Sequence, residues 1–540
     1  MTLESSATER GANQPPPLAG YDLYGENRPL VEAVAREGAD WADAELRAFG
    51  ALLGGAPLEW GRLANENPPK LRTHDRFGER IDEVEFHPAW HDLLRLGIEH
   101  GLHASPWRDP RPGAHVARAA AFVTLAQVEA GVGCPLSMTF AAVPALRSEA
   151  DIAAEWVPLL TSTSYEPQLR PASDKTGATC GMAMTERQGG SDVRANEMRA
   201  EPLGDGEATL QGQKWFCSAP MSDAFLVLAQ APAGLTCYLL PRVLPDGERN
   251  AFRILRLKDK LGNRSNASAE IELVHAWARR VGEEGRGIAT IMEMVVHTRL
   301  DCVLGSVGVM RRAVAEATHH AAHRVAFGRR LVEQPAMANV LADLCVDAEA
   351  ATALALRLAR AYDEDDVAFR RLATAVAKYW VCKTTPPLVA EALECLGGNG
   401  YVEESVLPRL FRESPLNSIW EGAGNVQALD VLRALDRQPE SLEAVIAELE
   451  AAAGADARLD AAVSELRTEL AAPSERDARR VVERLALCLA GAVLLRAGSQ
   501  VAEPFCATRL ARDWGRAYGT LPRGVDTSPI VERHLPLLPA

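Results

Sequence analysis

Residues 184–192 read M-T-E-R-Q-G-G-S-D and mark the point where the chain changes from helical to β-type patterning. Before this stretch, from about residue 21, apolar residues recur at helical spacing, most clearly over 115–131. After it, short β-type runs are separated by turn sequences, at 224–229, 236–240, 252–256 and 269–273. Because no helix separates these runs, we expect an antiparallel β-domain.

Helical periodicity returns after G-R-G at residues 285–287. Residues 288–327 contain no proline and predict one long helix. Further helical stretches at 335–361, 367–396 and 425–436 predict a helical bundle. An alanine-rich segment at 444–463 then opens a last helical region, which we expect to continue to the chain end.

These patterns predict an α+β protein that is mainly helical. We expect five parts: a disordered arm at 1–20, an N-terminal helical domain at 21–180, a β-domain at 181–284, a C-terminal bundle at 285–437 and an extra helical domain at 438–540.

Composition excludes several classes of protein. The chain has 540 residues and a formal charge of −15, so its bulk charge does not attract nucleic acid. Its 10 cysteines form no C-x-x-C pair, which excludes zinc-ribbon and thioredoxin-type sites and suits buried thiols in a reducing compartment. The apolar run at 485–495 is too short to span a bilayer, and residues 1–17 lack the apolar core of a signal peptide. We therefore expect a cytoplasmic protein with no membrane segment.

The motifs of metal and nucleotide enzymes are missing or incomplete. His319 and His323 have the spacing of zincin ligands, but His320 stands where the catalytic glutamate is needed. The chain has no P-loop, and no G-x-G-x-x-G follows a predicted strand. We predict no metal site.

Four segments together indicate a flavoprotein. Besides 184–192, they are G-Q-K-W-F-C-S at 212–218; R-V-A-F-G at 324–328 with Gln334 and L-G-G-N-G-Y at 396–401; and R-E at 412–413 with I-W-E-G-A-G-N at 419–425. In this order they resemble the signatures of the acyl-CoA dehydrogenase family. Residues 61–69, 86–91 and 258–268 resemble one branch of that family, which is named for the adaptive response to alkylation.

The resemblance implies an N-terminal helical domain, a central β-domain and a C-terminal four-helix domain, with FAD between the last two. It also implies a homotetramer, an acyl-CoA or related substrate and non-covalent FAD. The positions that match the family's FAD-binding residues are Met182, Met184, Thr185, Gly190, Ser191, Phe216, Cys217, Ser218, Arg324, Phe327, Gln334, Glu394, Gly397, Gly398, Trp420, Gly422, Ala423, Gly424 and Asn425. Among them, Arg324 and Gln334 match residues that reach the FAD of a neighbouring subunit.

Glu421 occupies the position of the family's catalytic base. Removing the α-proton of a thioester near neutral pH requires a carboxylate whose pKa is raised by burial. Some relatives place the base before an arginine of the long helix, but that position is Thr298 here. Glu421 is therefore the expected catalytic residue.

The last 70 residues carry ten arginines and seven acidic residues, a net charge of +3. If this region is helical, two rows of arginines share helix faces: Arg476, Arg480 and Arg484, and Arg509, Arg512 and Arg516. Such rows suit the phosphates of double-stranded DNA, although nearby acids offer them ion-pair partners instead. Three functions are thus open: a dehydrogenase with no DNA role, a DNA-associated flavoprotein with weak dehydrogenase activity in alkylation protection, and a non-catalytic helical scaffold.

Overall fold

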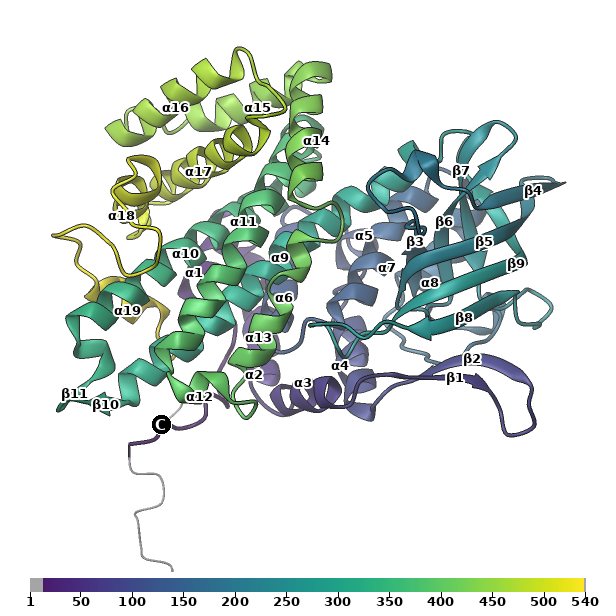
Figure 1. The fold of residues 1–540 in the computed structure, drawn as a ribbon, viewed down its shortest axis with the longest axis horizontal. Coiled ribbons are helices and arrows are strands. Elements are labelled where there is room, and N and C mark those ends of the chain that lie inside the picture. Colours follow the sequence, from purple (N-terminus) through teal and green to yellow (C-terminus); the bar gives the residue numbers. More distant parts are fainter. Residues whose placement is uncertain (1–12, 539–540) are drawn as a thin grey trace, which may run out of the picture.

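The structure, a computed structural model, describes residues 13–538. Before residue 180, the segments with helical periodicity form the N-terminal helices (Figure 1). These are α1 (Arg28–Arg36), α2 (Asp43–Leu53), α3 (Pro57–Glu66), α4 (Pro88–Glu99), α5 (Ser105–Arg108), α6 (Ala114–Ala126), α7 (Gly133–Leu146) and α8 (Ala150–Leu160). No described helix combines the length and hydropathy that crossing a membrane requires.

A hairpin interrupts these helices, which the sequence reading did not anticipate. Strand β1 (Lys70–His74) pairs antiparallel with β2 (Arg80–Glu85). The hairpin reaches beneath the larger sheet (Figure 1), where Arg80 donates a hydrogen bond to the carbonyl of Ile254 at 3.3 Å. Its two strands contain only three apolar residues, Leu71, Ile81 and Val84, so its periodicity is weak.

The N-terminal arm also differs from expectation where the structure describes it. Leu18 is buried, and the carbonyl of Pro16 is hydrogen-bonded to His319 Nε2 at 2.8 Å. The predicted disorder of residues 13–20 is therefore wrong, because their backbone is held by side chains of the long helix α9 (Gly287–His323). Residues 1–12 of the arm lie outside the described residues.

The β-type runs form one seven-stranded sheet. Its strands are β3 (Cys180–Ala183), β4 (Arg199–Gly204), β5 (Glu207–Ser218), β6 (Ala224–Ala231), β7 (Gly234–Pro241), β8 (Phe252–Leu257) and β9 (Ser268–Val281). They run in the order β3-β6-β4-β5-β9-β7, β8 pairs with β9, and β6 also pairs with β7, so the pairings close into a ring. Most pairs are antiparallel, as predicted, but β3 runs parallel to β6.

The predicted bundle is present after residue 286. It consists of α9, α10 (Pro335–Asp363), α11 (Val367–Cys395) and α14 (Gly424–Arg437). The connections between them carry β10 (Val325–Ala326), β11 (Arg329–Arg330), α12 (Gly398–Tyr401) and α13 (Leu407–Glu413). Helix α9 packs closely on α6 because Gly308 has no side chain: a Cβ there would lie 2.6 Å from the Cβ of Ala126.

The C-terminal helices cover one side of this bundle (Figure 1). They are α15 (Pro439–Glu450), α16 (Ala457–Leu470), α17 (Ala478–Arg496), α18 (Ala502–Phe505) and α19 (Ser528–His534). Residues 511–527 between α18 and α19 contain no helix, so the expectation of helix to the chain end is wrong there. Helix α17 packs on α10, α11 and α14.

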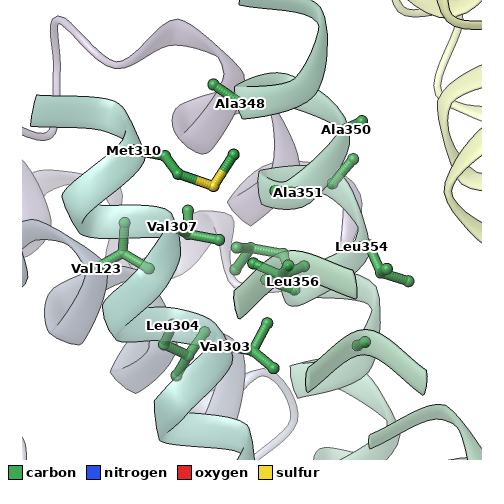
Figure 2. Close-up of a cluster of buried hydrophobic side chains, with 14 of the residues drawn as sticks. Val123, Val303, Leu304, Val307, Met310, Ala348, Ala350, Ala351, Leu354 and Leu356 are labelled. Carbon is green, nitrogen blue, oxygen red and sulfur yellow. The ribbon is translucent and has the colours of Figure 1, made fainter. Parts of the chain in front are cut away.

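The largest core cluster joins these parts. Figure 2 shows part of it, with Val307 and Met310 of α9 facing Ala351 and Leu356 of α10, and Val123 of α6 nearby. The same cluster continues into α17. The C-terminal helices thus bury their apolar faces against the bundle rather than in a core of their own.

Candidate active site

The turn that carries Glu421 is held by side chains from three helices. Lys378 of α11 is buried and donates hydrogen bonds to three backbone carbonyls of residues 417–422, at 2.8–3.0 Å. The carbonyl of Glu421 accepts bonds from Arg299 Nε of α9 at 3.0 Å and from Gln427 Nε2 of α14 at 2.9 Å. These bonds stabilise the backbone of Glu421 at a positive φ of +56°, a conformation that residues other than glycine rarely adopt.

The carboxylate of Glu421 faces α9. Its Oε2 accepts a hydrogen bond from Thr298 Oγ1 at 2.7 Å. Thr298 occupies the position at which some relatives carry the base, and here it is a hydrogen-bond partner of Glu421. Burial raises the pKa of Glu421, while the Thr298 hydroxyl and the charges of Lys378 and Arg299 oppose the rise. A partly buried carboxylate with a raised pKa suits the work of a general base.

The loop 184–192 is fixed to β5 by an internal ion pair. Glu186 is buried and contacts Lys214 Nζ at 2.7 Å, and the amide of Trp215 donates to the carbonyl of Thr185 at 2.8 Å. A Cβ on Gly190 would lie 2.5 Å from Thr185 Oγ1, so the loop requires a glycine there. The glutamate of this motif therefore holds the loop, and Thr185 and the exposed Ser191 remain available to a ligand.

Strand β5 presents alternating residues to its two faces. Phe216 is 48% exposed, and Ser218 Oγ lies 3.4 Å from Ser268 Oγ of β9. Cys217 between them is fully buried in the core of the β-domain. The prediction that Cys217 contacts the cofactor is thus wrong for its side chain, because the strand's alternation directs the thiol inward.

Two further predicted contacts lie near this edge. Met182 of β3 is buried and Met184 is partly buried, both within the cluster that packs between α7, the sheet and α9. Trp420 packs against the same cluster and donates its indole hydrogen to Asn417 Oδ1 at 2.8 Å. Trp420, which precedes Glu421, and the two methionines therefore pack in one apolar cluster.

The residues around Phe216 and Ser218, at the end of β5, fit a flavin. The side chain of Asn266 is buried, and neither end of its amide has a hydrogen-bond partner among the described residues. This amide and the Ser218 hydroxyl both lie beside the thiol of Cys134. An exposed aromatic ring, hydroxyl donors and an unpartnered buried amide are groups that a polar aromatic ring system needs.

Helix α14 begins at Gly424, directly after the turn that carries Glu421. Gly422 and Ala423 precede its first residue, and Asn425 is its second. No side chain caps it, and a Cβ on Gly424 would lie 2.6 Å from Lys383 Cε and 3.4 Å from Arg479 Nη2. Two cations beside the positive end of a helix suit a phosphate. Sequence reasoning missed these cations and Lys378, since a basic residue within a helix carries no motif.

The remaining predicted contacts lie at the other end of the bundle. Arg324 and Phe327 adjoin the β10–β11 turn, roughly 40 Å along α9 from Thr298 at a rise of 1.5 Å per residue. Figure 1 places α12, which follows Gly397, near this turn and away from the sheet. The other members of this distal group are Gln334, Glu394 and Gly398. One chain therefore does not bring them to Glu421.

The arginine rows expected to bind DNA do not form as predicted. Arg509 is 8% exposed and lies in a π-helical turn, where its guanidinium pairs with Asp343 at 2.7 Å and Asp347 at 3.0 Å. A buried, doubly paired guanidinium does not reach a phosphate. Arg512 and Arg516 then lie outside any helix, so the second row is wrong.

Two arginines of the first row lie on α17, and both are paired with acids. Arg480 pairs with Glu469 at 2.8 Å, and Arg484 pairs with Glu465 and Glu469 of α16 at 2.9 and 3.0 Å. Arg476, which precedes α17, is exposed and has no ion pair among the described residues. Of the second row, Arg512 is 3.5 Å from Glu465, and Arg516 is exposed and unpaired within the same part of the chain.

Comparison with known proteins defines the class. Three family models match: "Adaptive response protein AidB N-terminal domain" at residues 13–167, "Acyl-CoA dehydrogenase, middle domain" at 181–275 and "Acyl-CoA dehydrogenase, C-terminal domain" at 285–435. With the fold and the Glu421 site, they define an FAD-dependent acyl-CoA dehydrogenase-type oxidoreductase.

The chain is 48% identical to "Putative acyl-CoA dehydrogenase AidB" of Escherichia coli over 92% of this chain and 94% of that one. The structure of Caenorhabditis elegans ACDH-11 in complex with C11-CoA is similar, with a TM-score of 0.85 and 27% identity over 94% of this chain and 93% of that one. Butyryl-CoA dehydrogenase from Megasphaera elsdenii shares the fold at a TM-score of 0.58 and 22% identity, over 77% of this chain and 98% of that one. The protein belongs to the acyl-CoA dehydrogenase family, in its AidB branch.

Proposed function

We propose that the protein oxidises an acyl-CoA thioester, with Glu421 as the base. The α-proton passes to the Glu421 carboxylate, the β-hydrogen leaves with its electron pair, and the Cα–Cβ bond becomes a double bond. FAD, when bound, accepts that hydrogen and its electrons. The observation that carries this proposal is the partly buried Glu421 carboxylate, bonded to Thr298, in a turn held by hydrogen bonds from three helices.

Two groups of residues would hold FAD. We assign the flavin ring to the edge formed by Thr185, Phe216 and Ser218, with the phosphates toward Ser191 and the N-terminus of α14. The distal group, including Arg324 and Gln334, would hold the adenylate end of a neighbouring subunit's FAD. This division follows from the length of α9, which separates the two groups within one chain.

The acyl group is proposed to be short or branched. Trp420 directly precedes Glu421, and its indole is hydrogen-bonded to Asn417. This bulky side chain would therefore narrow the space for the acyl group next to Glu421. The test is anaerobic mixing of the FAD-loaded protein with a panel of acyl-CoAs while flavin absorbance is followed. We expect bleaching by at least one of them; an oxidised spectrum with every acyl-CoA, short, branched and long, would reject the dehydrogenase proposal.

We further propose a homotetramer in the cytoplasm. Large apolar side chains are exposed near the distal group: Phe327 is 98% exposed and Tyr401 is 80% exposed, which suits a subunit contact. All ten cysteines are buried free thiols, as suits a reducing compartment. Light scattering of the FAD-loaded protein should give four times the 58.3 kDa chain mass. A monomer that still retains FAD would contradict the shared site.

DNA association in protection from alkylation damage is the second proposed function. It is supported by the AidB resemblance and by Arg476 and Arg516, which are exposed and unpaired among the described residues. Contacts of this kind are to phosphate, so binding should be independent of sequence and should weaken steeply with salt.

The DNA prediction can be tested on the intact chain. The double variant Arg476→Ala/Arg516→Ala should weaken duplex binding and lower the magnitude of the log–log salt slope by about 2. The control Arg480→Ala removes a charge already paired with Glu469 and should change little. Equal duplex binding by the wild type and the double variant would exclude these arginines, and no binding by the wild type would favour an ordinary dehydrogenase.

A further inference from the structure

A lysine in the loop between β8 and β9 lies behind the flavin edge. Lys260 Nζ donates hydrogen bonds to the carbonyl of Asn266 at 2.6 Å and to Ser268 Oγ at 3.1 Å. Ser268 Oγ is in turn 3.4 Å from Ser218 Oγ. The hydroxyl of Ser268 thus connects the Lys260 ammonium to the Ser218 hydroxyl at the proposed flavin edge.

No carboxylate among the described residues contacts the ammonium of Lys260. Within residues 13–538 no acidic oxygen lies within 4.0 Å of its ammonium, whereas the buried Lys175 and Lys214 each pair with an acid at 2.5 and 2.7 Å. The two acids whose charges act on Lys260, Glu413 and Glu129, are bound elsewhere: they accept hydrogen bonds from Asn263 and from Ser265.

The lysine remains charged under working conditions. Burial lowers the pKa of Lys260 to about 8, while Cys134, Glu413 and Glu129 oppose the fall, so the ammonium is mostly protonated at neutral pH. A cation inside a protein that has no acid in contact acts over several ångströms, because the effective dielectric constant there is about 20 rather than 80.

The direction of the hydrogen bonds follows from the donors. Lys260 can only donate, so Ser268 Oγ accepts from it and is free to donate its own hydrogen to Ser218 Oγ. The Ser218 hydroxyl then has its hydrogen available for an acceptor outside the pair, because the neighbouring Cys134 thiol is only a weak acceptor. Ser268 and Ser218 sit opposite one another in the β5–β9 register, so the backbone maintains this arrangement.

We propose that Lys260 is a positioning residue of the flavin site: through Ser268 it orients the Ser218 hydroxyl toward the cofactor, and its charge favours the reduced flavin. The inference rests on the proposed placement of the flavin against Ser218. Reduction adds electrons to the ring, and a nearby cation with no carboxylate in contact stabilises the added negative charge. Lys260 therefore raises the reduction potential of the bound FAD.

The test compares FAD-loaded wild type with Lys260→Met and Lys260→Arg by redox titration of the flavin absorbance. We expect Lys260→Met to lower the equilibrium constant for reduction about tenfold, which is about 30 mV for a two-electron couple. Lys260→Arg keeps the charge and should restore most of the potential. A Lys260→Met potential equal to the wild-type value, or no restoration by arginine, overturns the inference.

Two serine variants make the result decisive. Ser268→Ala keeps the lysine but removes the link to Ser218, so it should shift the flavin absorption band; an unchanged band overturns the positioning role, even if Lys260→Met fails to fold. Ser218→Ala tests the placement itself. If Ser218→Ala leaves both band and potential unchanged, the proposed flavin site is wrong; if it changes them while Lys260→Met does not, only the role of Lys260 fails.

Discussion

Glu421→Gln is expected to abolish acyl-CoA-dependent flavin reduction while FAD stays bound. The amide has nearly the same shape but cannot accept the α-proton, and general bases contribute about 10²–10⁴-fold to rates. The loss should reach the upper end of that range because Thr298 occupies the alternative base position. The measurement is the rate of anaerobic flavin bleaching by an acyl-CoA that reduces the wild type, with FAD content determined on the same samples.

Stability separates this loss of activity from loss of folding. Because burial raises the pKa of Glu421, the ionised carboxylate destabilises the fold, and the contribution of Glu421 to stability falls as pH rises through its folded pKa. Glutamine carries no charge, so Glu421→Gln should melt at or above the wild-type temperature at neutral pH. The same raised pKa predicts that wild-type flavin reduction speeds up with pH as the carboxyl ionises. A variant that bleaches at the wild-type rate would remove Glu421 from the mechanism.

Thr298→Val provides a matched control for that experiment. It removes the hydroxyl that donates to Glu421 Oε2 and keeps the volume of the side chain. Without this bond the carboxylate loses a stabilising partner, so the pKa of Glu421 should rise further. We expect the pH profile of reduction to move to higher pH with the reaction retained, in contrast to its loss in Glu421→Gln.

Long periodic elements and clustered motifs could be predicted from the sequence, whereas partners across the fold could not. The long helix was expected over 288–327 and is observed as α9, because its burial on several sides keeps apolar residues on successive turns. The weakly patterned hairpin β1–β2 was missed for the opposite reason. Glu421 was found through its neighbours in the motif, but Lys378, which holds its turn, lies 43 positions earlier without any local signal.

Arg509 shows this limit most clearly. Its spacing from Arg512 and Arg516 predicted a shared helix face, but spacing carries no information about what a helix packs against. The aspartates that bind Arg509 are Asp343 and Asp347 of α10, more than 160 residues away in sequence. Those two acids are themselves four apart, on one face of a helix whose other residues are mostly apolar and buried.

Arg509→Met is therefore expected to destabilise the C-terminal helices strongly rather than to weaken DNA binding selectively. Removing one partner of a buried ion pair leaves uncompensated charge, which costs about 3–5 kcal/mol, and here two aspartates lose their cation. The guanidinium also lies 4.0 Å from the centre of the Trp514 ring, a contact that methionine does not reproduce. Hydrogen exchange across residues 457–538 and thermal melting should both report the loss.

Arg512→Met is the matched control, because Arg512 is exposed and only 3.5 Å from one exposed glutamate, Glu465. Surface substitutions of this kind change stability by about 0.5 kcal/mol or less. The pair of variants separates a structural from a phosphate-binding role, since both remove one arginine from the same predicted row. If Arg509→Met melts and exchanges like the wild type yet loses duplex binding, the buried ion pairs do not hold the C-terminal helices and Arg509 contacts DNA after all. If Arg509→Met has a lower melting temperature than the wild type while Arg512→Met does not, the positive charge of Arg509 attaches residues 502–521 to α10. DNA contact must then come from the arginines that remain exposed.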